Sequence, residues 1–301
     1  MTIPNIPVTV EERAAMRRRV GLIVMLTSAA VFSTAGLFTK GVSASAWSVI
    51  FWRGIFAALF TTIYVARRGA INEEFIKMGR PGLLVALLGA FGTAAFIPAF
   101  KLTSIANVSL IYATAPFCAA GVAWLWFREQ PERRIMIATC VALLGVGLIV
   151  AESFGELHLR GDVLALWMTL MMSSVMVVYR RYPNTPTGGP AALSSIVLLP
   201  IALYFGDPFT APIFEIGIMA AFGLIFAVAS VALSEGARRL PPAEAALISA
   251  MEVPLAIVWA WAFFAEQPSV LVAIGGVIIL ASVFGSQVAS IMFDRKKPNP
   301  Y

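Results

Sequence analysis

Charged residues are scarce in this sequence. Asp, Glu, Lys and Arg together make up only 13% of its 301 residues, whereas hydrophobic residues make up 59% and the mean hydropathy is +0.86. A soluble domain carries about 25% charged residues, so this composition excludes a soluble globular protein and predicts an integral membrane protein. A transmembrane helix needs about 20 residues, which leaves room for about ten helices and for no large soluble domain.

Cysteine and histidine are almost absent. Cys118 and Cys140 both lie inside apolar runs, where cysteine behaves as a small hydrophobic residue, and they indicate no disulfide framework. With His158 as the single histidine, neither a metal site nor a Ser/His/Asp triad is indicated. No Gly-rich run ends in Gly-Lys-Ser or Gly-Lys-Thr, which excludes ATP hydrolysis at such a loop. These absences predict a protein without metal, cofactor or enzymatic activity.

Long apolar runs dominate what remains. Ten of them, bounded by Gly, Pro or charged residues, cover residues 20–38, 47–66, 82–100, 105–127, 135–151, 163–179, 191–205, 216–237, 243–265 and 269–293. Most of these runs approach the length that crosses a bilayer as a helix, and the seventh is the weakest because it is short and rich in Ser and Pro. The predicted fold is all-α and integral to the membrane, with ten transmembrane helices.

The basic residues predict the orientation of these helices. Most of the 22 Lys and Arg residues fall at the two termini or in every second connection between runs. Cytoplasmic loops carry such an excess, so both termini are expected on the cytoplasmic side and the number of spans must be even. Although the net charge is +6, the basic residues lie at the ends of apolar runs and not on one face, which argues against a nucleic-acid partner.

One stretch of the chain occurs twice. Residues 104–131 resemble residues 242–268. When Pro116 is aligned with Pro254, the apolar positions around them also align, and after one deletion Glu129 aligns with Glu266. Each half then holds five spans, and an odd number reverses the direction of the second half. The sequence therefore predicts two inverted five-helix repeats, residues 1–151 (with a cytoplasmic N-terminal segment) and 152–301, an architecture typical of transporters.

Pro116 and Pro254 lie inside the fourth and ninth runs. A proline removes a backbone hydrogen bond and bends a helix, and a bilayer tolerates this only where the freed carbonyl is covered by protein or faces a cavity. We therefore expect a central binding site near the midplane, with bending at Pro116 and Pro254 gating opposite faces.

The doubled five-helix unit, the ten spans and the ending Glu-Gln-Pro in helices four and nine resemble the EamA-type branch of the drug/metabolite transporter superfamily. The resemblance runs from about Val20 to Phe293. The family's usual Trp-Gly near the start of helix one is here Phe32 and Ser33, and its usual Gly-Glu-Arg after helix four is residues 128–130, Arg-Glu-Gln. The family's Arg early in helix two is present as Arg53.

This resemblance implies a substrate class and a location. Similar proteins mostly move amino acids, nucleotide-sugar precursors or small lipophilic cations, and the bacterial ten-helix members are commonly exporters in the inner (plasma) membrane. It also implies that helices one, three, four, six, eight and nine line the cavity. The candidate substrate-binding residues on these helices are Phe32, Ser33, Thr34, Phe96, Phe100, Tyr112, Thr114, Trp167, Ser174, Ser230, Ser234, Ser249 and Glu252. Each aromatic residue taken alone is more typical of packing or of lipid contact.

Glu252 is the most informative single residue because it lies inside the ninth run, two residues before Pro254. A carboxylate in hydrocarbon is costly unless it is protonated, paired or facing water, so it marks a cavity. Glu252 would either contact a substrate ammonium or carry a coupled proton; the structural alternative is a protonated carboxyl that satisfies backbone opened by Pro254. Its counterpart in the first repeat is Thr114.

Other residues have structural interpretations. Arg53 is expected to extend to the headgroups, and Trp124, Trp126, Trp259 and Trp261 are expected to anchor helix ends at the interface. The glycines of helices five and ten, Gly145, Gly147, Gly275, Gly276 and Gly285, permit close helix approach. That approach could serve packing within a monomer or, less expectedly, a homodimer seam.

The sequence thus predicts a secondary-active transporter that works by alternating access and exports amino acids, among them aromatic ones, or similar small amphipathic metabolites. Its predicted partners are that small-molecule substrate and membrane lipids. The alternative within transport is a multidrug or quaternary-cation exporter, in which Glu252 and the aromatic residues attract the cation. From other classes, an intramembrane enzyme lacks a nucleophile or metal set, and a lipid scramblase would expose a polar groove to lipid.

Overall fold

A computed structural model describes residues 10–128, 133–152, 158–237, 239–240 and 248–294, and within these ranges the chain is helical and contains no strand. Six helices are long and apolar enough to cross a membrane, and a seventh span results if one bent helix pair is counted. Three shorter apolar helices cover residues 135–151, 252–264 and 270–286. A multi-pass, all-helical membrane fold is therefore confirmed.

Helices fall within all ten predicted runs. Their bounds are α1 Val10–Phe32, α2 Ala35–Lys40, α3 Ala46–Arg67, α4 Gly79–Leu102, α5 Ile105–Tyr112, α6 Ala115–Phe127, α7 Arg133–Glu152, α8 His158–Arg181, α9 Gly188–Phe205, α10 Ile213–Ala237, α12 Glu252–Phe264 and α13 Val270–Asp294, with a short π-helix η1 at Asn72–Ile76 and a 3-10 helix η2 at Pro208–Thr210. The first and fourth runs each divide into two helices.

The breaks in the first and fourth runs have local causes. Between α5 and α6 the chain bends by 42°, and Pro116 is placed in the first turn of α6, where its missing N–H needs no partner. The bend therefore lies just before Pro116. Pro254 is likewise the third residue of α12. Between α1 and α2, Ser33 and Thr34 donate their hydroxyls to the carbonyls of Ala30 and Val31, which competes with a continuous helical ladder.

The C-terminal ends of α6 and α12 adopt the same unusual conformation. Arg128 (φ 59°) and Ala265 (φ 52°) are the two residues other than glycine with positive φ in the described chain. Each directly precedes the glutamate of a Glu-Gln-Pro sequence. Left-handed backbone is costly for residues with a Cβ atom, so the two helix ends share a feature that local propensity does not favour.

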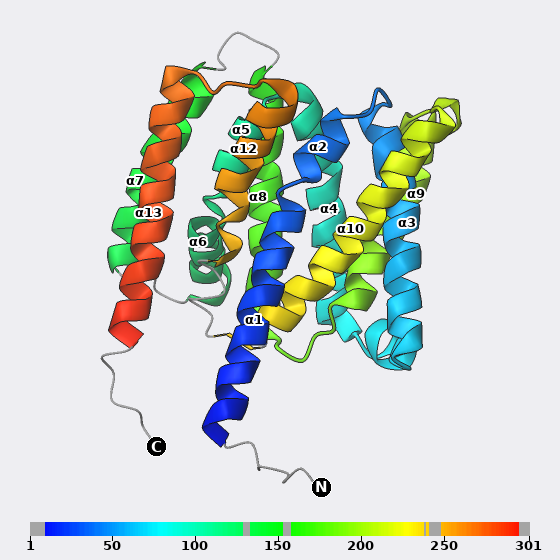
Figure 1. The fold of residues 1–301 in the computed structure, drawn as a ribbon, viewed down its shortest axis with the longest axis horizontal. Helices are drawn as coiled ribbons and strands as arrows, with labels where there is room; N and C mark the ends of the chain where they lie inside the picture. The colour runs from blue at the N-terminus through cyan, green and yellow to red at the C-terminus, as the bar shows by residue number, and fades with distance from the viewer. Residues whose placement is uncertain (1–9, 129–132, 153–157, 238, 241–247, 295–301) are drawn as a thin grey trace, which may run out of the picture.

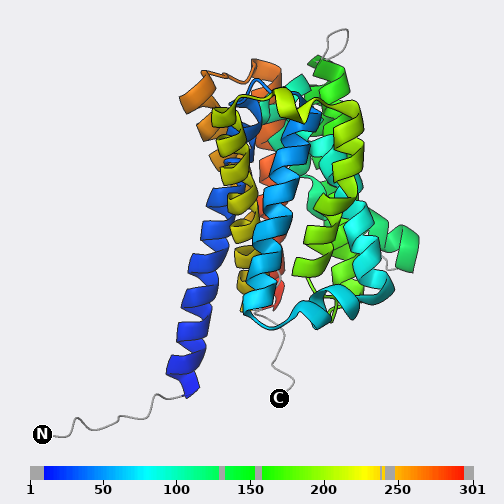
Figure 2. The ribbon, with the colours of Figure 1, turned by 90° about the vertical axis from the view of Figure 1, so that its right-hand side faces the viewer.

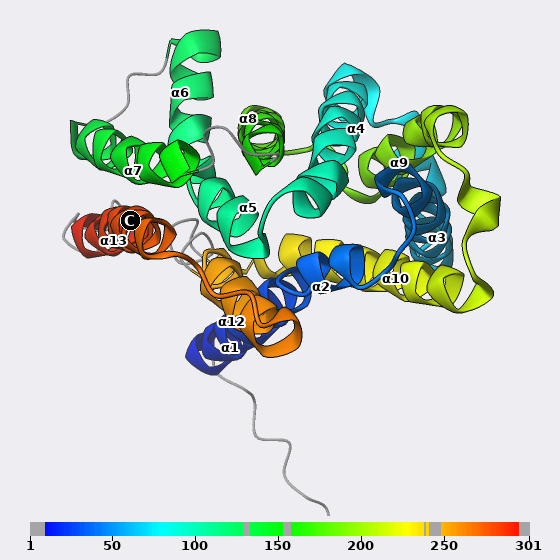
Figure 3. The same ribbon diagram turned by 90° about the horizontal axis from the view of Figure 1, so that it is seen from above.

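The helices run roughly side by side through the molecule, and α1 begins at the same end of the bundle at which α13 ends (Figure 1). Seen along the bundle, α6, α7 and α13 lie on one side and α3, α9 and α10 on the other, with α4, α5 and α8 between them (Figure 3). The side view shows α1 extending beyond the other helices at the end with the termini (Figure 2).

Glycine permits the closest contact between α7 and α13. A Cβ atom on Gly145 would lie 2.6 Å from the carbonyl oxygen of Gly275, and a Cβ atom on Gly275 would lie 2.6 Å from that of Gly145. The close approach predicted for these glycines is thus present within the monomer, and Gly276 approaches Leu110 in the same way. At Gly147 and Gly285 a Cβ atom would meet nothing within 4 Å, so these two glycines make no close approach within the described monomer.

Two large apolar clusters form most of the core. One gathers residues of α4 to α8, α12 and α13, including Ile111, Met168 and Ile279, and the other gathers residues of α2, α3, α4, α9 and α10, including Ile50 and Met219. Phe96 packs against both clusters. Phe96 therefore connects the two clusters.

Candidate functional site

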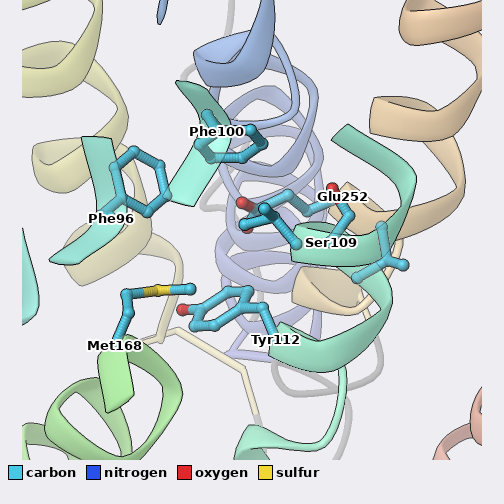
Figure 4. A pocket seen from close by; sticks show the side chains of 8 residues that line it. Phe96, Phe100, Ser109, Tyr112, Met168 and Glu252 are labelled. Atoms are coloured by element: carbon cyan, nitrogen blue, oxygen red, sulfur yellow. The ribbon is translucent and has the colours of Figure 1, made fainter. Parts of the chain in front are cut away.

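A small cavity lies between α4, α5, α8 and the start of α12. Phe96, Phe100, Ser109, Tyr112, Met168 and Glu252 line it, together with two valines (Figure 4). Four of these, Phe96, Phe100, Tyr112 and Glu252, are among the substrate-binding residues predicted from the sequence. The cavity has room for about 10 Å³, which corresponds to about one water molecule, so it cannot hold an amino acid in this conformation.

Glu252 is placed at this cavity by the start of α12, of which it is the first residue. A carboxylate at a helix N-terminus interacts favourably with the free backbone N–H groups of the first turn. Within the described chain, no hydrogen bond or ion pair to its side chain is found. The T-shaped pair of Phe96 and Phe100, with ring centroids 4.9 Å apart, lies on the same cavity (Figure 4). The carboxylate is therefore available to a ligand or a proton.

A much larger cavity lies toward the end of the bundle that holds both termini. It measures about 900 Å³, which suits a small metabolite. Its walls come from α3, η1, α4, α8, α9 and α10, and charged residues from the helix ends line it, among them Arg68, Glu73, Lys77 and Glu235. Two tyrosines, Tyr64 and Tyr179, supply aromatic surface. Of the substrate-binding residues predicted from the sequence, Ser230 lines this cavity.

Polar contacts connect the two halves of the chain at the opposite end of the bundle. Glu266, which follows α12, pairs with Lys40 at the end of α2 and also accepts a hydrogen bond from the backbone N–H of Ile105 at 3.0 Å. Glu215 accepts from the backbone N–H groups of Ser43 (2.9 Å) and Ala44 (3.0 Å) and from the Ser43 hydroxyl. Both carboxylates thus join α12 or α10 to the first half of the chain.

The remaining predicted residues lie apart from the small cavity. Phe32 packs edge-on against Phe226, with ring centroids 5.6 Å apart, and Ser249 lies 3.5 Å from the sulfur of Met25. Thr34, Thr114 and Ser174 donate to carbonyls of their own segment. Trp167 is 48% exposed and lines neither of the two cavities. Ser234 belongs to α10, but its side chain lies outside the described residues.

Trp259 differs from the interfacial anchor that the sequence predicted. Its Nε1 donates to Ser33 Oγ at 3.0 Å, so the indole connects α12 to the break between α1 and α2. Trp124, Trp126 and Trp261 are each about half exposed, in keeping with the prediction for them. A tryptophan near a helix end carries no sequence signal that separates these two roles.

Arg53 also differs from its prediction. The side chain is 2% exposed and does not extend toward the headgroups. Its Cζ atom lies 4.1 Å from the ring centroid of Phe226 and 5.1 Å from that of Phe222, both on α10. Phe222 and Phe226 are distant from Arg53 in sequence, so the position of Arg53 within the second apolar run did not indicate this burial.

Asp162 is a buried residue that sequence analysis missed. It is 0% exposed and accepts from the hydroxyl of Thr103 at 2.8 Å and from the side-chain amide of Asn107 at 3.2 Å. These bonds connect the start of α8 to the turn between α4 and α5. Asp162 lies near the start of a long apolar run. An acidic residue at such a position is typically an exposed residue at the end of a helix.

Comparisons with known proteins agree with this architecture. The chain is 25% identical over 289 residues to the pseudopaline exporter CntI of Pseudomonas aeruginosa, covering 92% of this chain and 96% of that protein. It is 24% identical over 297 residues to solute carrier family 35 member G1 of mouse, covering 89% and 78%, and 22% identical over 235 residues to the uncharacterized transporter YyaM of Bacillus subtilis, covering 71% and 75%.

A solved crystal structure has the same fold, with a TM-score of 0.65 at 18% identity over 92% of this chain and 99% of that one. The model of the EamA-like transporter family matches twice, over residues 19–151 and residues 159–287. These two matches cover most of the sequence. The chain belongs to the EamA-like transporter family, within the drug/metabolite transporter superfamily, and is a membrane transporter.

Proposed function

We propose that this protein is a secondary-active exporter of amino acids, aromatic ones included, or of similar small amphipathic metabolites. The observation that carries the proposal is the one-sided access to the molecule's interior. The cavity of about 900 Å³ lies toward the end with the termini, whereas contacts of Glu266 and Glu215 join the helices at the other end. An exporter takes up its cargo in such a state when that cavity faces the cytoplasm.

The proposed orientation places both termini and the large cavity on the cytoplasmic side of a bacterial inner membrane. Support comes from the excess of Lys and Arg at the helix ends near the termini. One of the similar proteins is named as an exporter, which favours the same direction of transport here.

The proposed mechanism is alternating access between two inverted five-helix repeats. In its support, the family model matches the two halves separately, over residues 19–151 and 159–287. The matching left-handed residues Arg128 and Ala265 also close equivalent helices of the two halves. In the outward-facing state the halves exchange conformations, so the cavity near the termini closes and the end held by Glu266 opens. Pro116 and Pro254 lie at the helix starts where this exchange would bend the chain.

Glu252 is the proposed contact for the substrate ammonium or for a coupled proton. It is ringed by Phe96, Phe100 and Tyr112, and its carboxylate has no hydrogen-bond or ion-pair partner in the described chain. The same surroundings favour a second candidate function, a quaternary-cation or multidrug exporter, because aromatic faces and a carboxylate both attract a bulky cation. Substrate selectivity separates the two.

The test is uptake by proteoliposomes of a panel of radiolabelled amino acids and one quaternary cation, with and without a pH gradient. Wild type is compared with two variants, Glu252→Gln and Asp207→Asn. The second removes an exposed carboxylate in the connection between α9 and η2. We expect saturable uptake of amino acids by wild type and Asp207→Asn. In Glu252→Gln the stimulation by the gradient should be lost, because an amide cannot carry the coupled proton.

Each outcome of this test has a meaning. If only the quaternary cation moves, the cation exporter replaces the amino-acid exporter. Equal gradient dependence in wild type and Glu252→Gln would remove Glu252 from proton coupling. If a folded preparation moves none of the compounds, the proposed substrate class is wrong.

A further inference from the structure

Arg53 carries a positive charge in the interior of the bundle, and the proposed transport mechanism does not involve this charge. It lies seven residues into α3, about 10 Å along the helix axis, and is 2% exposed. Its Nε is buried without a hydrogen-bond partner, and within the described chain it forms no ion pair. A guanidinium stays charged under all physiological conditions, and a buried charge is normally paired.

The aromatic rings around Arg53 compensate this charge only in part. Phe222 and Phe226 of α10 both present their faces to the guanidinium, at 5.1 and 4.1 Å, and Phe38 and Phe32 pack behind them. A cation over an aromatic face gains far less than a hydrogen-bonded ion pair in the same surroundings. The rings hold the guanidinium in place and leave its N–H donors unused.

The large cavity reaches the other side of one of these rings. Phe226 lines that cavity and at the same time covers the guanidinium of Arg53. On α3, Thr61 also lines the cavity. It lies about two helical turns from Arg53 and therefore on the same face of the helix. Arg53 does not itself line the cavity, but its guanidinium lies against Phe226, which does.

We propose that Arg53 binds the carboxylate group of the transported molecule, after the ring of Phe226 has rotated away. A guanidinium offers two parallel N–H donors that match the two oxygens of a carboxylate. This inference deepens the proposed function and rests on it for the nature of the cargo. It also favours the amino-acid exporter over the cation exporter, because a quaternary cation has no group for Arg53 to bind.

Glu252 and Arg53 divide recognition of the cargo between them. Both side chains lie in the interior, one is an acid and the other a base, and neither has a hydrogen-bond or ion-pair partner in the described chain. They stand on different elements, at the start of α12 and within α3. In this proposal Glu252 recognises an ammonium and Arg53 a carboxylate.

The test separates the carboxylate from the amine. Purified protein in detergent is titrated with 3-phenylpropionate, which has only the carboxylate, and with phenethylamine, which has only the amine, and binding is read from the concentration dependence of the unfolding temperature. For Arg53→Gln we expect the apparent Kd for 3-phenylpropionate to rise about tenfold or more, with that for phenethylamine unchanged. A purely structural role for Arg53 would change both compounds alike.

Two matched variants complete the design. Arg67→Gln removes an exposed arginine of the same helix that lines neither cavity, and it should bind both compounds as wild type does. Phe226→Leu keeps apolar bulk and removes the ring that covers the guanidinium, so 3-phenylpropionate should bind more tightly. Because Phe226→Leu leaves the buried charge in place, it tests the proposal even if Arg53→Gln does not fold.

The proposal is overturned if wild type does not bind 3-phenylpropionate, if Arg53→Gln binds it with unchanged affinity, or if Phe226→Leu does not strengthen its binding. These readouts require no transport, so they fail independently of the proposed function. Binding that depends on Arg53 without amino-acid uptake by proteoliposomes would retain the carboxylate site and exclude amino acids as the cargo. Amino-acid uptake without such binding would retain the exporter and exclude Arg53.

Discussion

At the scale of single residues, the hydrogen bond from Trp259 to Ser33 is the clearest link between α12 and the break in the first span. Ser33 is 2% exposed, and its hydroxyl accepts from the indole N–H at 3.0 Å. In Ser33→Ala that N–H loses its acceptor, which costs about 1 kcal/mol or more. We expect the free energy of unfolding to fall by that amount, measured as a lower midpoint of thermal unfolding in detergent.

Ser282→Ala is the matched control for this prediction. Ser282 is also buried, but its hydroxyl donates only to the carbonyl of Ile278 in its own helix, so its loss should change stability by at most about 0.5 kcal/mol. Combining Ser33→Ala with Trp259→Phe removes both partners and should cost less than the sum of the single changes. Strict additivity would show that the bond does not contribute.

At the scale of elements, the left-handed ends of α6 and α12 carry a local cost. Ala265 has φ 52° and its N–H bonds back to the carbonyl of Trp261, a helix end that glycine adopts without steric penalty. Ala265→Gly should therefore raise the free energy of unfolding by about 0.5–1 kcal/mol. The measurement is again the thermal midpoint in detergent.

The same Ala-to-Gly substitution one helical turn earlier should change the free energy of unfolding in the opposite direction. Ala262 is exposed and lies in the last turn of α12, and Ala262→Gly should lower stability by up to about 1 kcal/mol because glycine is a poor helix former. If both variants were destabilised alike, the left-handed helix end would not be the native conformation. Such a result would also weaken the equivalence between Ala265 and Arg128.

At the scale of the whole molecule, the pair of Lys40 and Glu266 holds one end closed. Both side chains are about one-fifth exposed, and an ion pair of this kind contributes up to about 1 kcal/mol. Lys40→Gln should therefore shift the population toward opening at this end, by up to about fivefold. The readout is the rate at which a membrane-impermeant maleimide, added from the side of Lys40, reacts with Ser109→Cys in a Cys118→Ala, Cys140→Ala background.

Arg160→Gln provides the control for this experiment, because Arg160 is an exposed charge of the same sign at the same end of the bundle. It should leave the labelling rate of Ser109→Cys unchanged, whereas Glu266→Gln should raise it at least as much as Lys40→Gln. Glu266 also accepts from the backbone N–H of Ile105, and Gln can keep that bond only in the weaker, uncharged form. Unchanged labelling in both variants would show that this pair does not keep the end closed.

The sequence by itself determined the membrane class, the apolar runs in which the helices lie and the family. Composition and run length suffice for this because each span must be apolar along its own length, whatever packs beside it. The repetition of Pro116 at Pro254 and of Glu129 at Glu266 likewise follows from the chain alone. Glu252 could be singled out for the same reason, since one carboxylate in an apolar run is visible without a partner.

Only the tertiary structure decided which of two environments a helical residue occupies. Arg53 and Trp259 both looked like residues that reach the interface, yet α10 encloses Arg53 between Phe222 and Phe226 and Ser33 binds Trp259. Gly145 and Gly147 are two residues apart on one helix, but only Gly145 meets another backbone. In a membrane protein both lipid and core are apolar, so hydrophobicity does not distinguish the two faces of a helix, and the neighbouring helices do.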